Sequence, residues 1–242
     1  MFTLARRSNN RVWIISITLL AALAVLGALR SPMFNVQQVV VEGNRLVSEQ
    51  DILDLANVGL GTNIFRVPTA SIAQNVALHP LIKSVNVSRR LPSTLVISVT
   101  ERQPVAMVPV QNGFVIVDEQ GVFLQRSDTW PKNAVPIISG VKIPNNLDLG
   151  KQIQGASLQE GLKIVAGLPK QLYAQVGEVY AGNQDMLAMY TRDGLEVRLG
   201  LAEDLNQKFS VLRQFLDDKD YQAYRTGFYV DLSSGKPVIG KK

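Results

Sequence analysis

The sequence predicts an α+β protein made of a single N-terminal transmembrane helix, a small domain with the order βααββ, and a mostly antiparallel β domain with flanking helices. A run of 18 residues without charge, 12–29, comes first. It is followed by a segment whose hydrophobic period changes from strand to helix and back to strand. From Pro104 onward short alternating runs dominate, interrupted by two segments with helical spacing. We therefore expect two folded domains, over residues 34–103 and 104–242.

The apolar run is predicted to form a transmembrane helix over residues 12–30. At about 1.5 Å of rise per residue it is about 27 Å long, close to the roughly 30 Å hydrocarbon core of a bilayer. Basic residues without acidic neighbours mark the side that stays in the cytoplasm. Those residues are Arg6, Arg7 and Arg11. The tail 1–11 is therefore expected in the cytoplasm of a single-pass type II inner-membrane protein, with the bulk of the chain in the periplasm.

A cleaved signal peptide is the alternative for this run. Ala22-Leu23-Ala24 has the small-x-small pattern of a cleavage site after a ten-residue apolar core. The residues that follow, 25–29, are still apolar, whereas a polar exit is typical of a cleaved leader. This favours the anchor.

Residues 34–103 are expected to form strand, helix, helix, strand and strand. A valine-rich strand over 36–42 stops at a Gly-Asn turn, and Ser48 and Asp51 have the Ser-x-x-Asp spacing that begins a helix, with Gly59 to end it. A second helix runs over about 69–78 and stops before Pro80. The last two strands are 85–89 and 95–100, joined by a Leu-Pro-Ser turn. Their apolar positions are expected to face the two helices.

The segment from Pro104 is expected to be mostly β. A hairpin is predicted around residues 118–121, with Gly121 at a position that requires positive φ. A helix through Leu158 and Leu162 should end at Pro169, and a second helix over 205–216 has the clearest amphipathic spacing. The expected extended segments are 114–117, 122–124, 136–140, 176–180, 186–191, 195–199 and 227–232.

Composition argues against catalysis and metal binding. The chain has no Cys and a single His, His79, so neither a Cys/His nucleophile pair nor a zinc site of the usual ligands can be assembled. No Gly-x-Ser-x-Gly elbow or phosphate-binding loop is present. The net charge of +5 falls to +2 when the three N-terminal arginines are set aside, which does not indicate nucleic-acid binding. We expect no catalytic residues, no cofactor, no metal and no small-molecule substrate.

Both halves of the chain resemble one family. The βααββ order and "HPLIKSVNVSRRLPSTLVISVTERQPVA", residues 79–106, resemble the POTRA domain of the bacterial division protein family FtsQ/DivIB. The stretches "GFVIVDEQGVFL", "PIISG", "DGLEVRLG" and "YVDLSSGKPV" are similar, in that order, to the β domain of the same family. The resemblance implies a non-enzymatic divisome scaffold at the division septum that binds FtsB and FtsL and helps control septal peptidoglycan synthesis. FtsK, FtsW and FtsI are further partners that it implies.

The last predicted strand is the candidate partner-binding site. A strand at the end of a sheet can accept main-chain hydrogen bonds from an added strand. The resemblance assigns FtsB binding to this region, while Ser233 stands where many relatives have a basic residue. The alternative is that these residues only close the sheet. The candidate residues are Tyr229, Val230, Asp231, Leu232, Ser234, Gly235 and Lys236.

A second candidate surface lies in the smaller domain. It consists of Val87, Ser88 and Arg89, for which a solvated strand end is the alternative. The alternative function is a POTRA-containing secretion or outer-membrane assembly factor. Such a protein would need a pore-forming barrel, and too little chain remains after Arg102 to supply one.

Overall fold

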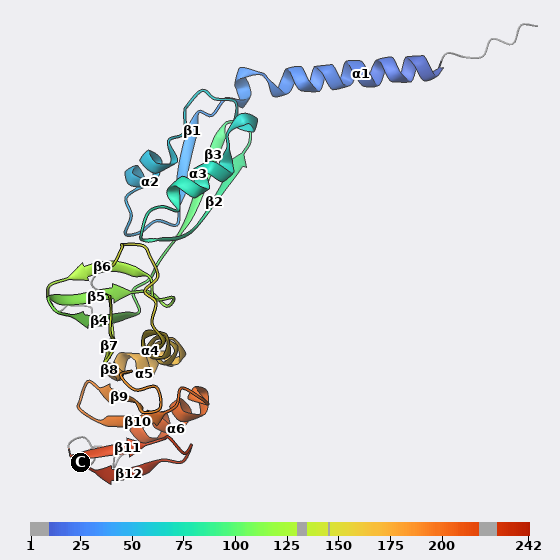
Figure 1. Ribbon diagram of the computed structural model, residues 1–242. Coiled ribbons are helices and arrows are strands. Elements are labelled where there is room, and N and C mark those ends of the chain that lie inside the picture. The colour runs from blue at the N-terminus through green and yellow to red at the C-terminus, as the bar shows by residue number, and fades with distance from the viewer. Residues whose placement is uncertain (1–9, 130–134, 145, 218–226) are drawn as a thin grey trace, which may run out of the picture. The chain divides into compact units, whose positions relative to one another are not determined.

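The structure is a computed structural model that describes residues 10–129, 135–144, 146–217 and 227–242. It divides into two compact units, Met1–Glu101 and Arg102–Lys242. Figure 1 shows the elements of each unit in chain order. Each unit has its own hydrophobic core.

The first unit begins with helix α1 (Asn10–Leu29), whose described side chains are exposed. No helix in the part of the chain that the structure describes is both long and apolar enough to cross a membrane. The membrane crossing predicted over residues 12–30 is therefore not borne out.

The remainder of the first unit has the predicted βααββ order, with two short 3-10 helices added. Strand β1 pairs parallel with β3, and β2 pairs antiparallel with β3, so the sheet order is β1-β3-β2. Helices α2 and α3 contact each other, while α2 also contacts β1 and α3 also contacts β2. Its elements are η1 (Pro32–Phe34), β1 (Gln38–Glu42), α2 (Glu49–Ala56), η2 (Ile64–Arg66), α3 (Thr69–Val76), β2 (Ile82–Arg90) and β3 (Thr94–Glu101).

Local chemistry explains where helix α2 begins and where it ends. The Ser48 hydroxyl accepts a hydrogen bond from the main-chain N–H of Asp51 at 3.1 Å, as the Ser-x-x-Asp spacing predicts. The helix ends at Asn57, which adopts the left-handed conformation with φ of 44°, two residues before the predicted Gly59. The core beneath the helices includes Ile52, Leu95 and Ile97, each fully buried.

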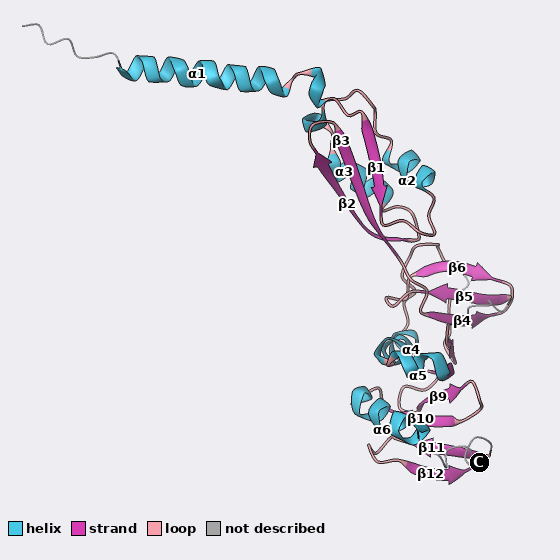
Figure 2. Cartoon of the chain, turned by 180° about the vertical axis from the view of Figure 1, so that it is seen from behind, coloured by secondary structure: helices cyan, strands magenta, loops and turns pink. Residues whose placement is uncertain are grey.

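The second unit is a nine-stranded sheet with the order β12-β11-β10-β9-β8-β7-β4-β5-β6. Helices α4 and α6 contact each other, and α4 also contacts β7 and β8 (Figure 2). The core between helices and sheet includes Leu162, Val197 and Phe209. The elements are β4 (Ala106–Val110), β5 (Gly113–Val117), β6 (Phe123–Ser127), β7 (Ile137–Ser139), α4 (Ala156–Gly167), α5 (Lys170–Gln175), β8 (Val176–Tyr180), β9 (Leu187–Thr191), β10 (Glu196–Gly200), α6 (Leu205–Asp217), β11 (Phe228–Asp231) and β12 (Val238–Lys241).

The sheet is mixed: five of its eight described strand pairs are antiparallel, as a mostly antiparallel domain requires, and three are parallel, which the sequence did not predict. The pairs β7–β8, β10–β11 and β4–β7 are parallel, and the other neighbours are antiparallel. The chain passes through α4 and α5 between β7 and β8, and through α6 between β10 and β11. A helix that connects two neighbouring strands returns the chain to the same end of the sheet, which makes the strands parallel.

The hairpin predicted at residues 118–121 is present. Gly121 has φ of 77°, and a buried carboxylate, that of Asp118, fixes the turn by accepting hydrogen bonds from the N–H groups of Gln120 and Val122, both at 2.9 Å. The other oxygen of Asp118 accepts a hydrogen bond from Arg102 at 2.6 Å. Strand β5 therefore ends, and β6 begins, at a turn that is fixed by hydrogen bonds.

Candidate partner-binding site

The C-terminal end of the second unit is formed by β11 and β12. Strand β12 pairs antiparallel with β11, with Tyr229 opposite Gly240 and Asp231 opposite Val238. Strand β11 therefore lies between β10 and β12 and is not the last strand of the sheet. Sequence reasoning missed β12 because it has four residues, follows Pro237 and contains Gly240, a composition that weakly signals a strand. The expectation that the strand over 227–232 is the last strand of the sheet is accordingly corrected.

Of the candidate residues, Tyr229, Val230 and Asp231 lie in β11. The others follow in the turn that leads to β12. That turn is ordered by hydrogen bonds, because the Asp231 carboxylate accepts from the Ser233 N–H at 2.8 Å and from its hydroxyl at 2.6 Å. The N–H of Gly235 donates to the carbonyl of Leu232 at 3.0 Å. Leu232 itself is fully buried, so its side chain supports the turn from within.

The main-chain N–H and C=O groups on the outer side of β12 belong to Ile239 and Lys241, as the hydrogen bonds between β11 and β12 show. The N–H of Lys242 donates to the carbonyl of Gly227 at 2.8 Å, and these two residues are opposite each other in the register of β11 and β12. Hydrogen-bonded and non-hydrogen-bonded pairs alternate along an antiparallel ladder. Residues 238 and 240 therefore bond inward to β11, whereas the N–H and C=O groups of Ile239 and Lys241 point to the outer side. No described strand pairs with that side.

One row of side chains crosses the sheet on a single face. The register of neighbouring strands aligns Glu178, Tyr190, Glu196, Tyr229 and Gly240 across β8, β9, β10, β11 and β12. Gly240 is required beneath the Tyr229 ring, because a Cβ at residue 240 would lie 2.2 Å from the ring carbon Cζ. The row thus ends in a flat aromatic surface at the β12 edge.

Charged side chains stabilise this row. The Arg198 guanidinium lies 3.6 Å from the centroid of the Tyr229 ring and donates to Glu196 at 2.8 Å. The Lys242 ammonium lies 3.3 Å from the same carboxylate. Partial burial acts to raise the pKa of Glu196, but the hydrogen bonds from Arg198 and Lys242 outweigh it and hold that pKa below its ordinary value. The same pairing raises the pKa of Arg198, so both charges persist at neutral pH.

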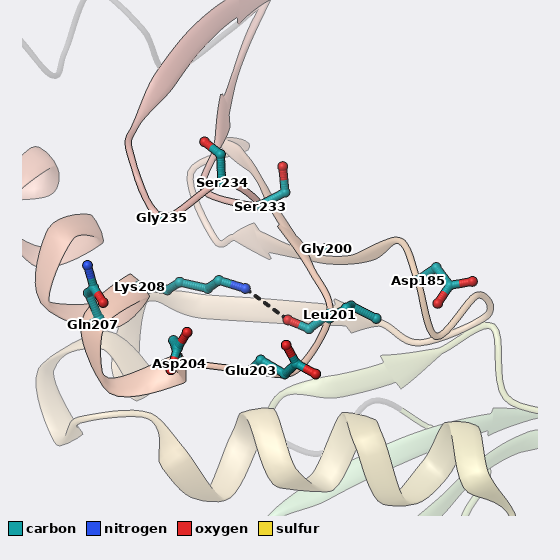
Figure 3. Close-up of a pocket in the computed structure, with 10 residues that line it drawn as sticks. All are labelled: Asp185, Gly200, Leu201, Glu203, Asp204, Gln207, Lys208, Ser233, Ser234 and Gly235. Atoms are coloured by element: carbon teal, nitrogen blue, oxygen red, sulfur yellow. Dashed lines mark hydrogen bonds between the residues drawn. The ribbon is translucent and has the colours of Figure 1, made fainter.

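A cavity of about 440 Å³ lies between the β11–β12 turn and the start of α6. Figure 3 shows Ser233, Ser234 and Gly235 on one side of it and Lys208, Asp204 and Glu203 on the other. Lys208 is 5% exposed, and its ammonium donates to the carbonyls of Leu199 at 2.8 Å and Leu201 at 2.9 Å.

These contacts hold the chain around Gly200, which has φ of 65°. A Cβ at Gly200 would lie 2.9 Å from the Cβ of Ser233. Lys208 therefore fixes the base on which the β11–β12 turn lies, and its role in this geometry is structural.

The predicted surface in the first unit lies on β2, the last strand on one side of its sheet. Val87 is half-buried, while Ser88 and Arg89 are exposed. The Arg89 guanidinium donates from Nε to the carbonyl of Ile64 and from an Nη to that of Val67, both at 2.8 Å. Its side chain thus fastens η2 to the sheet.

The described residues contain no group of three or more His, Cys, Asp or Glu side chains placed to hold a metal ion. His79 has a local role, since its Nδ1 accepts a hydrogen bond from the N–H of Leu81 at 3.2 Å. The arrangement at β11 and β12 can offer main-chain hydrogen bonds and a rigid aromatic and charged surface. It is suited to binding another protein chain.

Two domain models of one protein family match the chain. Residues 34–102 match the model of the FtsQ-type POTRA domain, and residues 106–233 match that of the C-terminal domain of cell division protein FtsQ/DivIB. The chain belongs to the FtsQ/DivIB family. It is therefore a non-enzymatic cell division protein.

Relatives in the FtsQ/DivIB family align over most of the chain. Cell division protein DivIB of Clostridium botulinum (strain Loch Maree / Type A3) is 24% identical over 240 residues, covering 97% of this chain and 92% of the relative. Cell division protein FtsQ of Anaeromyxobacter sp. (strain K) is 26% identical over 233 residues, covering 91% and 78%. The solved extracytoplasmic domain of DivIB from Geobacillus stearothermophilus is 23% identical and covers 44% of this chain and 87% of that domain, with a TM-score of 0.33.

Sequence reasoning did not single out several residues of this candidate site. They are Glu196, Arg198, Gly240 and Lys242, which meet only when β10, β11 and β12 are paired. The alternation of Glu196 and Arg198 with buried residues of β10 was visible and indicated which face they occupy. Nothing in the local sequence around Gly240 indicated that it faces Tyr229.

Proposed function

We propose that this chain is a scaffold of the bacterial divisome that binds an FtsB/FtsL pair by accepting a strand from FtsB on the outer side of β12. Through this contact it helps to control septal peptidoglycan synthesis and links early and late division proteins. The observation that carries the proposal is the outward-facing main chain of Ile239 and Lys241 at the end of a nine-stranded sheet.

An added strand gains both main-chain and side-chain contacts at this edge. Each main-chain hydrogen bond contributes about 0.5–1.5 kcal/mol net, and Ile239 and Lys241 offer a donor and an acceptor each. Val238 and Ile239 are 56% and 42% exposed, so an added strand buries apolar surface as well. Lys236 and Lys241 are exposed beside the edge and give it positive charge, which favours a strand with acidic neighbours.

The residues predicted from the sequence support this edge and do not form it. Tyr229 presents its ring beside Gly240, next to the position that the added strand would occupy. Asp231, Ser234, Gly235 and Lys236 shape the turn that brings β12 to β11. Val230 and Leu232 anchor the hairpin in the core.

The test is a proline at Ile239. Its N–H points outward, so Ile239→Pro removes a donor from the free edge without removing a hydrogen bond between β11 and β12. The matched control is Ile239→Val, which keeps the N–H and a β-branched side chain. We expect Ile239→Pro to weaken co-purification with the FtsB/FtsL pair by about tenfold or more, and Ile239→Val to leave it near the wild-type level.

Hydrogen exchange of the Gly240 amide, which bonds inward to Tyr229, reports whether β12 remains paired in each variant. Normal binding by an Ile239→Pro protein with a protected Gly240 amide would rule out strand addition at β12.

The proposed scaffold role also includes a second contact surface in the first unit and a place of action at the division septum. Contacts with FtsK, FtsW or FtsI are assigned in this proposal to the exposed side of β2 at Val87, Ser88 and Arg89. The folded units would act outside the cytoplasm at the division septum, with the exposed apolar side chains of α1 as the attachment to the membrane. A fluorescent fusion is expected at midcell, and depletion is expected to give filaments.

A further inference from the structure

We propose that one end of the first unit is a docking surface for an anionic lipid bilayer. We call it the Leu29 end, and it consists of residues 29–36, 59–66 and 89–93. Three segments that are far apart in the sequence meet there. The proposal is independent of the strand-addition site, which lies in the other unit.

Hydrogen bonds and a ring contact join the three segments into one surface. The Asn63 side chain donates to the carbonyl of Leu29 at 2.8 Å, and the rings of Phe34 and Phe65 lie 5.3 Å apart. The N–H of Gln37 donates to the carbonyl of Ser93 at 2.9 Å, and Arg89 bonds the carbonyl of Ile64. The Leu29 end is therefore a single packed surface at the point where α1 ends.

Large apolar side chains project from this surface into solvent. Met33 is 61% exposed, Leu60 67%, Phe65 42% and Leu91 56%. They come from η1, η2, the loop before η2 and the turn between β2 and β3, so no single element accounts for them. Several exposed apolar side chains gathered at one end of a small domain indicate an interaction surface.

The charge of the Leu29 end is positive without exception. Arg30, Arg66 and Arg89 lie within it, and none has a carboxylate partner among the described residues. A fourth arginine of these segments, Arg90, is paired with Glu42 at 3.2 Å.

The five carboxylates of residues 10–101 all lie outside the three segments of the Leu29 end. They are Glu42, Glu49, Asp51, Asp54 and Glu101. Glu42 is the last residue of β1, and three of the others are in α2. Glu101 is the last residue of β3 and binds the 45–47 loop. The first unit is therefore electrically polarised along its sheet, with the positive end next to α1.

Exposed apolar side chains interspersed with arginines match the boundary between lipid headgroups and acyl chains. Arginine keeps its guanidinium among phosphates while its aliphatic part lies in apolar surroundings, and basic residues near an anionic membrane are attracted to it. The exposed apolar helix α1 is continuous in sequence with this surface, ending at Leu29. A membrane in contact with the apolar side chains of α1 would thus meet Leu60, Phe65 and the exposed arginines Arg30 and Arg66 at its surface.

The chain has no Cys, so single labels can be placed without further changes. The full chain is prepared as Leu60→Cys, Phe65→Cys and, as a control, Leu78→Cys, each with an environment-sensitive fluorophore. Leu78 is 77% exposed and lies just before β2, at the opposite end of the sheet from the Leu29 end. The proteins are mixed with vesicles of phosphatidylcholine with phosphatidylglycerol, or of phosphatidylcholine alone, that carry a nitroxide-labelled lipid.

We expect the labels at residues 60 and 65 to be quenched by the nitroxide lipid in the anionic vesicles, and the label at 78 to stay unquenched. Arg30→Gln with Arg66→Gln should reduce the apparent lipid affinity of the labelled surface by about fivefold for each arginine, since a basic residue near such a surface contributes roughly 1 kcal/mol. Arg45→Gln, an exposed arginine at the opposite end, should leave it unchanged. High salt should weaken the quenching.

The proposal is overturned if the labels at 60 and 65 behave like the label at 78 while the protein is bound to the vesicles. It is also overturned if those labels become protected without lipid as protein concentration rises, which would identify a second copy of the chain as the occupant. Binding to FtsB/FtsL is measured separately, so either proposal can fail alone.

Discussion

Replacing Glu101 by Gln should destabilise the first unit more than the same replacement of any exposed carboxylate in that unit. Glu101 is 6% exposed, and its Oε1 accepts hydrogen bonds from the N–H groups of Arg45 at 2.8 Å, Leu46 at 3.0 Å and Val47 at 2.9 Å. Its Oε2 accepts a second bond from Leu46 at 2.9 Å. The carboxylate therefore holds the loop between β1 and α2 against the end of β3.

The expected cost follows from these contacts. A hydrogen bond to a charged group contributes about 1.5–3 kcal/mol. Glu101→Gln keeps one oxygen but turns an NH2 group toward donors that it cannot satisfy, so we expect a loss of about 2–3 kcal/mol. A unit of this size has a stability of only about 5 kcal/mol, so the loss should be large relative to the total.

The stability difference between wild type and Glu101→Gln should depend on pH. Burial acts to raise the pKa of Glu101, but the hydrogen bonds from residues 45–47 outweigh it and lower that pKa below the ordinary 4.5. A group with a depressed folded pKa stabilises the fold above its unfolded pKa and loses this effect as pH falls through the folded value. The difference between wild type and Glu101→Gln should therefore be full at neutral pH and shrink once pH falls below about 4.5.

The assay is hydrogen exchange with mass spectrometry on the full chain, following peptides from the 43–49 loop, α2 and β3 over a pH series. Glu42→Gln is the matched control, because Glu42 is half-exposed and forms only a surface ion pair with Arg90, whose loss should change stability by less than about 1 kcal/mol. Equal protection in wild type and Glu101→Gln, or a difference that does not change with pH, would refute the reasoning.

Three further changes test the second unit. Lys208→Met leaves two main-chain carbonyls without their donor and should cost about 2–3 kcal/mol, seen as faster exchange in residues 199–201 and 232–235. Arg102→Gln removes the cation 2.6 Å from the buried Asp118 carboxylate and should lower the free energy of unfolding by about 2–3 kcal/mol in a urea titration. Gly240→Ala should displace the Tyr229 ring and cost about 1–3 kcal/mol in thermal unfolding, whereas on a Tyr229→Ala background the same change should be nearly neutral.

Local sequence signals were sufficient for most elements of the first unit. The Ser48 cap, the valine-rich strand and the alternation of Leu95, Ile97 and Val99 each depend on neighbours within a few residues, and the structure contains all three features. The end of α2 was missed by two residues, because Asn57 adopts the left-handed conformation that was assigned to a glycine. That error is one of residue preference and does not affect the topology.

Pairing across the second unit depended on information that the local sequence does not contain. The helices on the path from β7 to β8 and from β10 to β11 were predicted in part, yet the parallel pairing that they cause requires knowing which strands become neighbours. Strand β12 was missed for a related reason, since its only strong partner is β11 and its sequence includes Gly240. The candidate site moved by one strand as a consequence, from β11 to β12.

The neighbouring residues Glu101 and Arg102 illustrate what the structure adds to a sequence motif. Both residues belong to the stretch 79–106 that resembles the FtsQ/DivIB POTRA domain, a resemblance that gives no physical reason for their charges. Glu101 binds three main-chain N–H groups of the loop before α2 in the first unit, while Arg102 binds the Asp118 carboxylate that fixes the β5–β6 turn in the second. Two adjacent side chains of opposite charge therefore stabilise different units, and exchanging them would place a carboxylate against Asp118 and a guanidinium against the main-chain N–H groups of residues 45–47.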